Sequence, residues 1–160
     1  MAAPGNGIPL LERRAIEAEL LLRVYAAASA SLGPQQARSI LEQAVDSAAL
    51  AAGRAFALAA PQGGPSLAHF ATVLERWQEG GVLDITDIRQ DADSLGFTVA
   101  RCAYVERYID LGVPAHLHAV FSCRRDAAFA EGYSPQLLLE RPQTIAEGHK
   151  ACCFVFRWQP

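Results

Sequence analysis

The sequence predicts an α+β fold in which N-terminal helices pack on a small, mainly antiparallel sheet of about four strands. Apolar residues recur at helical spacing through residues 1–79, whereas β-rich segments occur only in residues 80–160. These segments form two pairs with helical stretches between them, which is typical of an α+β arrangement. The chain has 160 residues, 51% of them hydrophobic, and is predicted to be a single domain over residues 1–160.

Two long helices are expected at the N-terminus. Between residues 10 and 32, Ile16, Leu20 and Val24 repeat at i, i+4 and i+8, which predicts that this stripe faces the core. Gly33-Pro34 ends the first helix and suits the first turn of a second one, which reaches about residue 59. Small residues on the second helix would let another helix approach closely. Its predicted inner face consists of Ile40, Leu41, Val45, Ala48 and Ala52.

A third helix and four strands complete the predicted fold. Ser66 is placed as the N-cap of a helix that ends at Gly80-Gly81. The first two strands are joined by a short polar loop and form a hairpin. Residues 115–130 are predicted to form one helix or two short ones that meet near Cys123. The later elements are strands 82–88 and 96–101, helices 102–111 and 115–130, a turn at 132–135, and strands 137–139 and 152–158.

The composition argues against several classes of partner. The net charge is −3 and the longest basic run is Arg124-Arg125, so no nucleic-acid partner is expected. There is no run of about 18 apolar residues, so no membrane span is expected. The first nine residues lack a secretory signal pattern, so the protein is expected to be cytoplasmic with its thiols reduced. Only 19% of residues are charged, which fits either a homo-oligomer or plain alanine-rich helices.

The candidate chemistry lies in the last 60 residues, which hold all four cysteines. Cys102 stands where a strand gives way to a helix, and free amide groups and the helix dipole at such a position favour a thiolate. Glu106 follows one turn later, where it would orient a partner or a water. Its charge opposes a thiolate unless a cation such as Arg101 balances it. The alternative is a buried structural cysteine at a strand end.

A second group of candidates includes Cys123 and Asp126, which share a helical face at i, i+3. They suit a nucleophile beside a carboxylate or two metal ligands. In the alternative, Cys123 packs inward and Asp126 caps the helix or pairs with a neighbouring arginine. His116 and His118 point apart on a helix, so one is expected to face inward and the other outward.

Cys152 and Cys153 are adjacent in the last predicted strand and therefore face opposite sides of it. Cys152 shares its face with Phe154 and Phe156 and is placed toward the apolar core. The chain has no CxxC, HExxH, GxGxxG, P-loop or GxSxG motif, so the chemistry that these motifs signal is unsupported.

Residues spaced along the C-terminal half resemble the L-2-amino-thiazoline-4-carboxylic acid hydrolase family. The resemblance covers about residues 80–158, and the chain departs from it at Cys153, where an acidic residue is expected. The closing Gly148-x-x-x-Cys152-x-Phe154 also resembles vinyl-reductase-type small-molecule-binding domains, which are α+β. The matching positions are Phe97 to Glu106; Cys123, Asp126, Phe129 and Glu131-Gly132; and Leu139, Arg141, Thr144-Ile145, Gly148, Cys152 and Phe154.

The resemblance implies a hydrolase that opens a small ring at the carbon between nitrogen and sulfur and gives an N-carbamoyl amino acid. This reaction needs a nucleophile, a proton shuttle and a donor for the developing negative charge. Cys102 or Cys123 would be the nucleophile, and Asp126 or Glu106 the acid/base. The substrate would be bound by Arg141, which clamps its carboxylate, and by Thr144, His118 and Cys152.

No cofactor is expected, although a rival mechanism has the cysteines and Asp126 hold a divalent metal that activates water. The other functional alternative is a vinyl-reductase-type binding or sensory module without catalysis. The enzyme hypothesis predicts that Cys102, Cys123, Asp126 and Cys152 converge on one pocket. The binding-module hypothesis predicts scattered cysteines around a closed apolar pocket.

Overall fold

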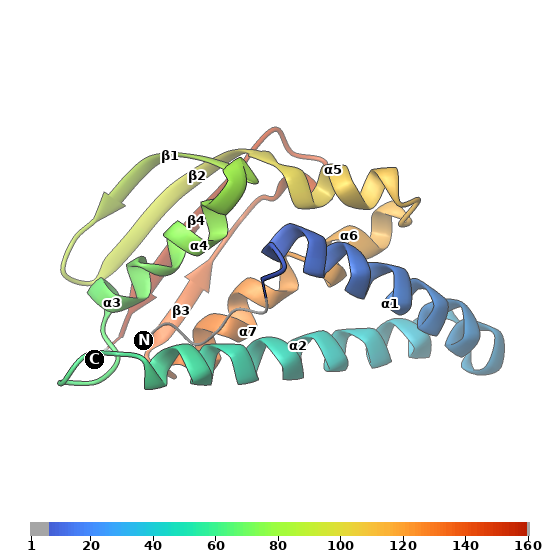
Figure 1. Cartoon of the computed structure of the whole chain (residues 1–160), viewed down its shortest axis with the longest axis horizontal. Helices are drawn as coiled ribbons and strands as arrows, with labels where there is room; N and C mark the ends of the chain where they lie inside the picture. The colour runs from blue at the N-terminus through green and yellow to red at the C-terminus, as the bar shows by residue number, and fades with distance from the viewer. Residues whose placement is uncertain (1–6, 160) are drawn as a thin grey trace.

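The computed structural model describes residues 7–159, and its elements follow the predicted order (Figure 1). The α+β prediction is confirmed: helices precede and flank a four-stranded antiparallel sheet of order β1-β2-β4-β3. The helices are α1 (Leu10–Leu32), α2 (Pro34–Leu58), α3 (Leu67–Ala71), α4 (Val73–Gln78), α5 (Ala103–Asp110), α6 (Ala115–Phe121) and α7 (Arg124–Tyr133), with 3-10 turns η1 (Glu79–Gly81) and η2 (Ile145–Glu147). The strands are β1 (Leu83–Gln90), β2 (Ser94–Cys102), β3 (Leu137–Glu140) and β4 (Cys152–Trp158).

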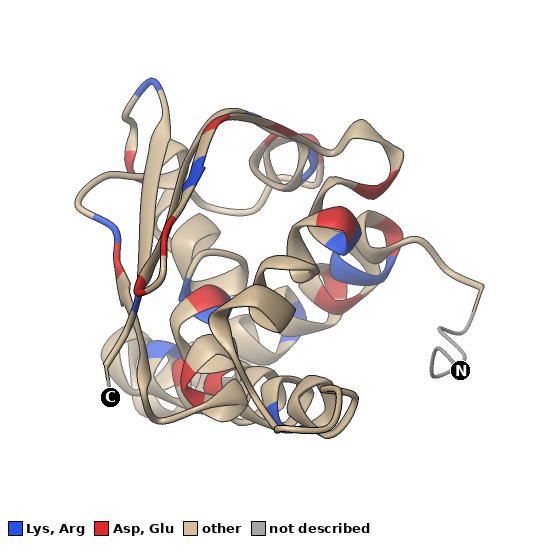
Figure 2. Ribbon diagram, turned by 90° about the vertical axis from the view of Figure 1, so that its left-hand side faces the viewer, with Lys and Arg blue, Asp and Glu red and all other residues tan. Residues whose placement is uncertain are grey.

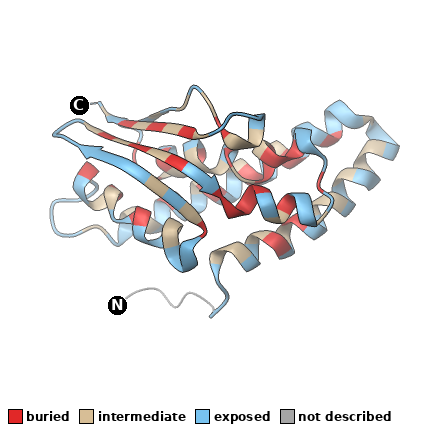
Figure 3. Cartoon of the chain, turned by 90° about the horizontal axis from the view of Figure 1, so that it is seen from above, coloured by how far each residue is buried: buried red, intermediate tan, exposed pale blue. Residues whose placement is uncertain are grey.

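One face of the sheet carries the apolar core. Along the central strands β2 and β4, buried residues alternate with less buried ones, while edge strand β1 is largely exposed (Figure 3). The buried residues pair directly across the two strands: Leu95 with Phe156, Phe97 with Phe154, and Val99 with Cys152. The rings of Phe97 and Phe154 stack with centroids 4.7 Å apart. This register places Cys152 on the inner face, as its strand periodicity predicts.

The prediction for the inner face of α1 is wrong. Ile16, Leu20 and Val24 are 57%, 64% and 39% exposed, whereas Ala15 and Ala18 are buried. The structure therefore turns this stripe outward, together with the exposed Ile40 of α2. A second apolar stripe of α1 packs against the core instead: Leu11, Ala15, Ala18, Leu22 and Tyr25. Acidic and basic residues are interspersed along the ribbon rather than gathered on one face (Figure 2). Within residues 7–159 no helix combines the length and the apolar character needed to cross a bilayer.

Helices α2 and α7 pack at very short range because a glycine faces the partner backbone on each side. A Cβ atom built on Gly53 would lie 2.1 Å from the carbonyl oxygen of Phe129, and one on Gly132 would lie 2.3 Å from that of Leu50. A small residue on α2 does allow a close approach, but it is Gly53, which the predicted inner face did not include. Of that predicted face Leu41 and Val45 are buried, whereas Ile40, Ala48 and Ala52 are exposed. The predicted turn at residues 132–135 is partly wrong, since Gly132 and Tyr133 belong to α7.

Two other predicted helices are broken into shorter pieces. Ser66 is the N-cap of α3, as expected, and its Oγ accepts a hydrogen bond from the amide of His69 at 3.2 Å. The segment that follows is interrupted at Thr72, whose hydroxyl donates to the carbonyl of His69 at 2.7 Å. Residues 115–130 form two helices that meet at Cys123, which is one of the two predicted alternatives. That junction brings Cys123 to a helix start.

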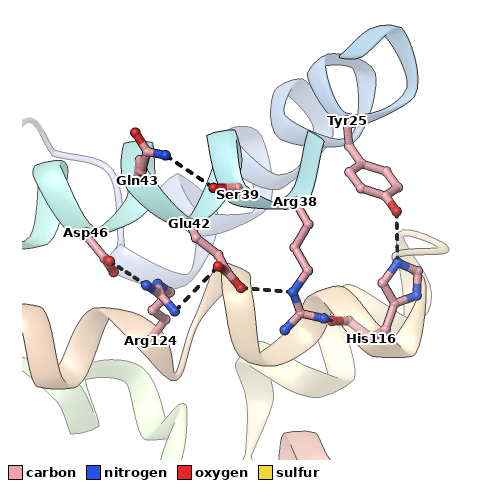
Figure 4. Close-up of polar contacts among 8 residues, drawn as sticks. All are labelled: Tyr25, Arg38, Ser39, Glu42, Gln43, Asp46, His116 and Arg124. Atoms are coloured by element: carbon pink, nitrogen blue, oxygen red, sulfur yellow. Dashed lines mark hydrogen bonds and ion pairs between the residues drawn. The ribbon is translucent and has the colours of Figure 1, made fainter. Parts of the chain in front are cut away.

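A polar network on the outer side of α2 fixes α6 and α7 to the long helices (Figure 4). Arg124 of α7 donates to Asp46 at 2.7 Å and lies 3.8 Å from Glu42. Arg38 donates to Glu42 at 2.9 Å and to the carbonyl of His116 at 3.3 Å. Because these side chains are partly exposed, each pair contributes little on its own. Together they help to position α7, the helix that begins at Cys123.

Candidate functional site

A cavity of about 330 Å³ lies between the start of α1, helices α2, α4 and α7, and the inner face of the sheet. Four of the predicted site residues line it: Cys102, Cys123, Asp126 and Cys152. They come from the end of β2, the start of α7 and the start of β4, so distant parts of the sequence meet here. Its wall is strongly aromatic, with Trp77, Phe97, Phe129 and Phe154 among the lining residues.

Cys102 is the last residue of β2 and the N-cap of α5, the strand-to-helix junction that the sequence predicts. Burial raises the pKa of its thiol to about 11, although the backbone amides of Val105 and Tyr104 lower it. The amides at the helix start therefore lower the pKa of Cys102, as expected, but burial raises this pKa by a larger amount. At neutral pH Cys102 is a neutral thiol.

The other two cavity thiols are also neutral at rest. Burial raises the pKa of Cys123 to about 12, and the negative charge of Asp126 adds to the effect. Burial likewise raises the pKa of Cys152, whose sulfur accepts a hydrogen bond from the amide of Ile145 at 3.2 Å. A cysteine in this cavity needs a proton acceptor before it can act as a nucleophile.

Asp126, in the first turn of α7, lines the cavity and is the candidate for this proton acceptor. Arg141 donates from Nη1 to Asp126 Oδ2 at 2.5 Å and from Nη2 to the carbonyl oxygen of Cys123 at 2.8 Å. The guanidinium also lies 5.1 Å from the ring centroid of Phe154. Burial raises the pKa of Asp126 to about 6, although the charge and the hydrogen bond of Arg141 oppose this. Asp126 is therefore mostly ionised at neutral pH, yet readily protonated.

The remaining predicted site residues lie outside this cavity. Glu106 is exposed and bound to Arg101 by hydrogen bonds of 2.5 and 2.8 Å. His118 is buried, and its Nε2 lies 2.8 Å from the carbonyl oxygen of Val113. His116 is exposed, so the two histidines do point apart.

Arg141 and Thr144 line a second, smaller hollow of about 170 Å³ on the other side of Cys123. The Thr144 hydroxyl donates to the Glu147 carboxylate at 2.7 Å and accepts from the Glu147 amide at 3.3 Å, which caps η2. Cys153 does not line the large cavity, because it faces away from Cys152 along β4. The large cavity thus contains half of the predicted site residues.

Sequence reasoning missed the polar side of the cavity. Glu17 of α1 accepts hydrogen bonds from Arg14 at 2.7 and 3.0 Å and from Arg125 at 2.9 Å. All three line the cavity, as does Tyr104 of α5. The i, i+3 spacing of Arg14 and Glu17 was a detectable signal.

No metal site emerges from the side chains in residues 7–159. In that part of the chain, no three His, Cys, Asp or Glu side chains come close enough together to hold a metal ion. The three cavity cysteines and Asp126 therefore line the same cavity, but no three of them are close enough together to bind one metal ion.

Iodoacetamide is expected to label Cys102 and Cys123 slowly at pH 7, because burial keeps both sulfurs protonated. For both residues the rate should rise about tenfold per pH unit, in proportion to the thiolate fraction. Peptide mass spectrometry of time courses between pH 7 and 9.5 measures both rates. Urea-unfolded protein is the control for intrinsic reactivity. Rapid, selective labelling of either residue at pH 7 would contradict the raised pKa values.

Comparison with known families agrees with the resemblance found in the sequence. A family model described as L-2-amino-thiazoline-4-carboxylic acid hydrolase matches residues 13–156. The match extends beyond the C-terminal half into α1 and α2, the helices that wall the cavity. A search of curated proteins gives no significant match. The chain therefore belongs to the L-2-amino-thiazoline-4-carboxylic acid hydrolase family.

Proposed function

We propose that the protein hydrolyses a small cyclic compound similar to 2-aminothiazoline-carboxylate in the large cavity and releases an N-carbamoyl amino acid. One observation carries the proposal: three thiols and a carboxylate from separate segments line one cavity in a member of this hydrolase family. These are the groups that nucleophilic and acid/base chemistry at a ring carbon requires.

The cavity suits a small, flat ring. Its volume of about 330 Å³ lies at the lower end of the range for small-molecule sites. Trp77, Phe97 and Phe154 offer aromatic faces and edges against which such a ring packs. A 2-aminothiazoline ring is a basic isothiourea, which is cationic when protonated, and the ionised Asp126 is the complementary charge.

Cys102 is the proposed nucleophile. Its pKa is raised less than that of Cys123, because the amides at the start of α5 favour its thiolate whereas Asp126 disfavours that of Cys123. As the Cys102 sulfur gives its proton to Asp126, the sulfur adds to the ring carbon between nitrogen and sulfur. The ring C–S bond then breaks, and the released sulfur takes the proton from Asp126.

Water completes the reaction. It adds to the carbon of the resulting enzyme-bound isothiourea. Asp126 transfers one proton of the water to the departing Cys102 sulfur, and the other proton goes to the former ring nitrogen as the C=O bond forms. The product is an N-carbamoyl amino acid with a free thiol, and one water is consumed. Arg141 holds the Asp126 carboxylate in place through these proton transfers.

A cysteine series tests this proposal with 2-aminothiazoline-4-carboxylate and related cyclic ureides as substrates. Cys102→Ser is expected to lower kcat by at least about 10³-fold, as loss of a nucleophile does. Cys153→Ser, which changes a cysteine outside the cavity, should retain wild-type turnover. Full activity in the Cys102, Cys123 and Cys152 serine variants would rule out covalent catalysis by the cavity thiols. Binding without turnover of any such ring by the wild type would favour the non-catalytic alternative.

A further inference from the structure

Tyr104 presents an unused hydrogen-bonding group at the large cavity. The residue is only 7% exposed, and its hydroxyl has no hydrogen-bond partner among residues 7–159. Buried hydroxyls in native proteins nearly always have a partner, because an unpaired one costs stability. A cavity-lining hydroxyl without a protein partner is therefore available for a ligand.

Arg14 offers further free donors on the same side of the cavity. Its Nη1 is committed to Glu17, but its Nε and Nη2 donate to no residue within 7–159. Helix α1, which carries Arg14, packs against α5, which carries Tyr104. The positive charge of Arg14 also lowers the pKa of Tyr104, so the two groups lie within electrostatic reach. Burial nevertheless raises that pKa to about 12, so the phenol remains a donor at neutral pH.

The cavity as a whole favours an anion. Arg13, Arg14, Arg76 and Arg125 line it, whereas only Glu17 and Asp126 supply negative charge among the described lining residues. Arg125 is already used, since it donates to Glu17 and to the carbonyl of Phe121. Arg141 is also committed, to Asp126 and to the Cys123 carbonyl, and does not line this cavity. Arg13 and Arg76 are exposed, so the more buried free donors lie on α1 and α5.

We propose that Arg14 and Tyr104 form the subsite that binds the substrate carboxylate. A guanidinium edge and a neutral hydroxyl together offer donors to both oxygens of a planar, singly charged carboxylate. The substrate then spans the cavity, with its carboxylate at Arg14 and its ring toward Asp126 and Cys102. This assignment rests on the proposed function and replaces Arg141 by Arg14 as the anion clamp.

Binding of two unreactive ligands tests the subsite separately from turnover. The probes are thiazolidine-4-carboxylate and thiazolidine-4-carboxamide, which differ only in the charged group. Isothermal titration calorimetry is applied to the wild type, Tyr104→Phe and Arg14→Gln. Tyr108→Phe and Arg101→Gln are the matched controls, because both residues lie outside the cavity lining.

The wild type is expected to bind the carboxylate at least about tenfold more tightly than the carboxamide, since hydrogen bonds to a charged group are strong. Tyr104→Phe should weaken carboxylate binding about five- to tenfold and leave carboxamide binding unchanged. Arg14→Gln should remove the preference, and both controls should keep it. Tyr104→Phe should melt no lower than the wild type, because its hydroxyl has no protein partner to lose.

Equal binding of the two probes by the wild type would overturn the subsite. So would an unchanged preference in Tyr104→Phe, a variant that keeps the shape of the side chain and the Arg14–Glu17 pair. A protein that shows the predicted binding pattern but opens no ring would retain the subsite and refute the hydrolase mechanism.

Discussion

Asp126→Asn is expected to lower kcat/KM for ring opening by about 10²- to 10⁴-fold, the range that general acid–base catalysis contributes. Asp126 lines the cavity together with the thiols, and its charge raises the pKa of both Cys123 and Cys102. An amide cannot accept the proton of an attacking thiol or water. Steady-state kinetics on the purified variant measure the loss. Because Asn has nearly the same shape, its side-chain oxygen still accepts the hydrogen bond from Arg141.

The pH profile of the wild type provides a second readout of the same residue. The carboxylate accepts a proton only when ionised, and burial raises its pKa to about 6. The rate is therefore expected to rise with pH up to about 6 and to level off above it, falling about tenfold per unit on the acid side. Asp126→Asn should lack this limb. A profile with the acid limb unchanged in the variant would assign the titration to another group.

Stability distinguishes a catalytic loss from unfolding. The pKa of Asp126 is raised in the folded protein, so its contribution to stability is fully present below about pH 4 and is lost as pH rises through 6. At neutral pH its ionised form is thus no source of net stability, and the Asn variant should melt close to the wild type. Asp46→Asn is the matched control, because Asp46 also binds an arginine but lies outside both hollows. It should keep full activity, because the amide oxygen of asparagine still accepts the hydrogen bond from Arg124 that helps to position α7.

Much of the fold was predictable because local patterns dictate it. The hairpin before Cys102 and the inward face of Cys152 follow from strand periodicity, which leaves little choice once one face of the sheet is buried. The N-cap Ser66 has a short-range chemical signal. Such features require only neighbours in sequence, so the chain alone defines them.

The orientation of α1 was not predictable from periodicity, because the helix has two usable faces. One apolar stripe, Ile16 with Leu20 and Val24, is exposed, and the polar pair Arg14–Glu17 faces the cavity. The inner stripe consists of Leu11, Ala15, Ala18, Leu22 and Tyr25. The rule that an apolar stripe meets the core therefore holds for α1, but the helix carries two such stripes, and spacing alone does not select between them.

The partners of the candidate site residues are equally non-local. Arg141 lies 15 positions beyond Asp126, and only the return of the chain from α7 through β3 brings the two into contact. Spacing in sequence identified both as candidates but gave Arg141 a role toward substrate rather than toward Asp126. Tyr104 could not be identified as a binding residue, since an absent hydrogen bond has no sequence signature.

Gly53→Ala and Gly132→Ala are each expected to lower the free energy of unfolding by about 3 kcal/mol or more, the scale of overpacking against a rigid backbone. Both glycines lie inside helices, where replacement by Ala normally stabilises by about 1 kcal/mol. The built Cβ atoms, however, would lie 2.1 and 2.3 Å from backbone carbonyl oxygens of the facing helix, which cannot rotate away. Urea denaturation followed by circular dichroism measures the change.

The sign of the change in the free energy of unfolding shows which effect is larger. Helix propensity alone would make the alanine variants more stable, whereas close packing of α2 on α7 makes them less stable. Gly96→Ala is the matched control, because its Cβ would come no closer than 3.6 Å to the Phe154 carbonyl oxygen, and it should cost less than about 1 kcal/mol. A stabilised Gly53→Ala variant would show that the helices are farther apart than described. Since Cys123 is the N-cap of α7 and the helix carries Asp126, separation of the two helices should also reduce activity. The same glycine contact that stabilises the fold thereby positions the proposed acid/base.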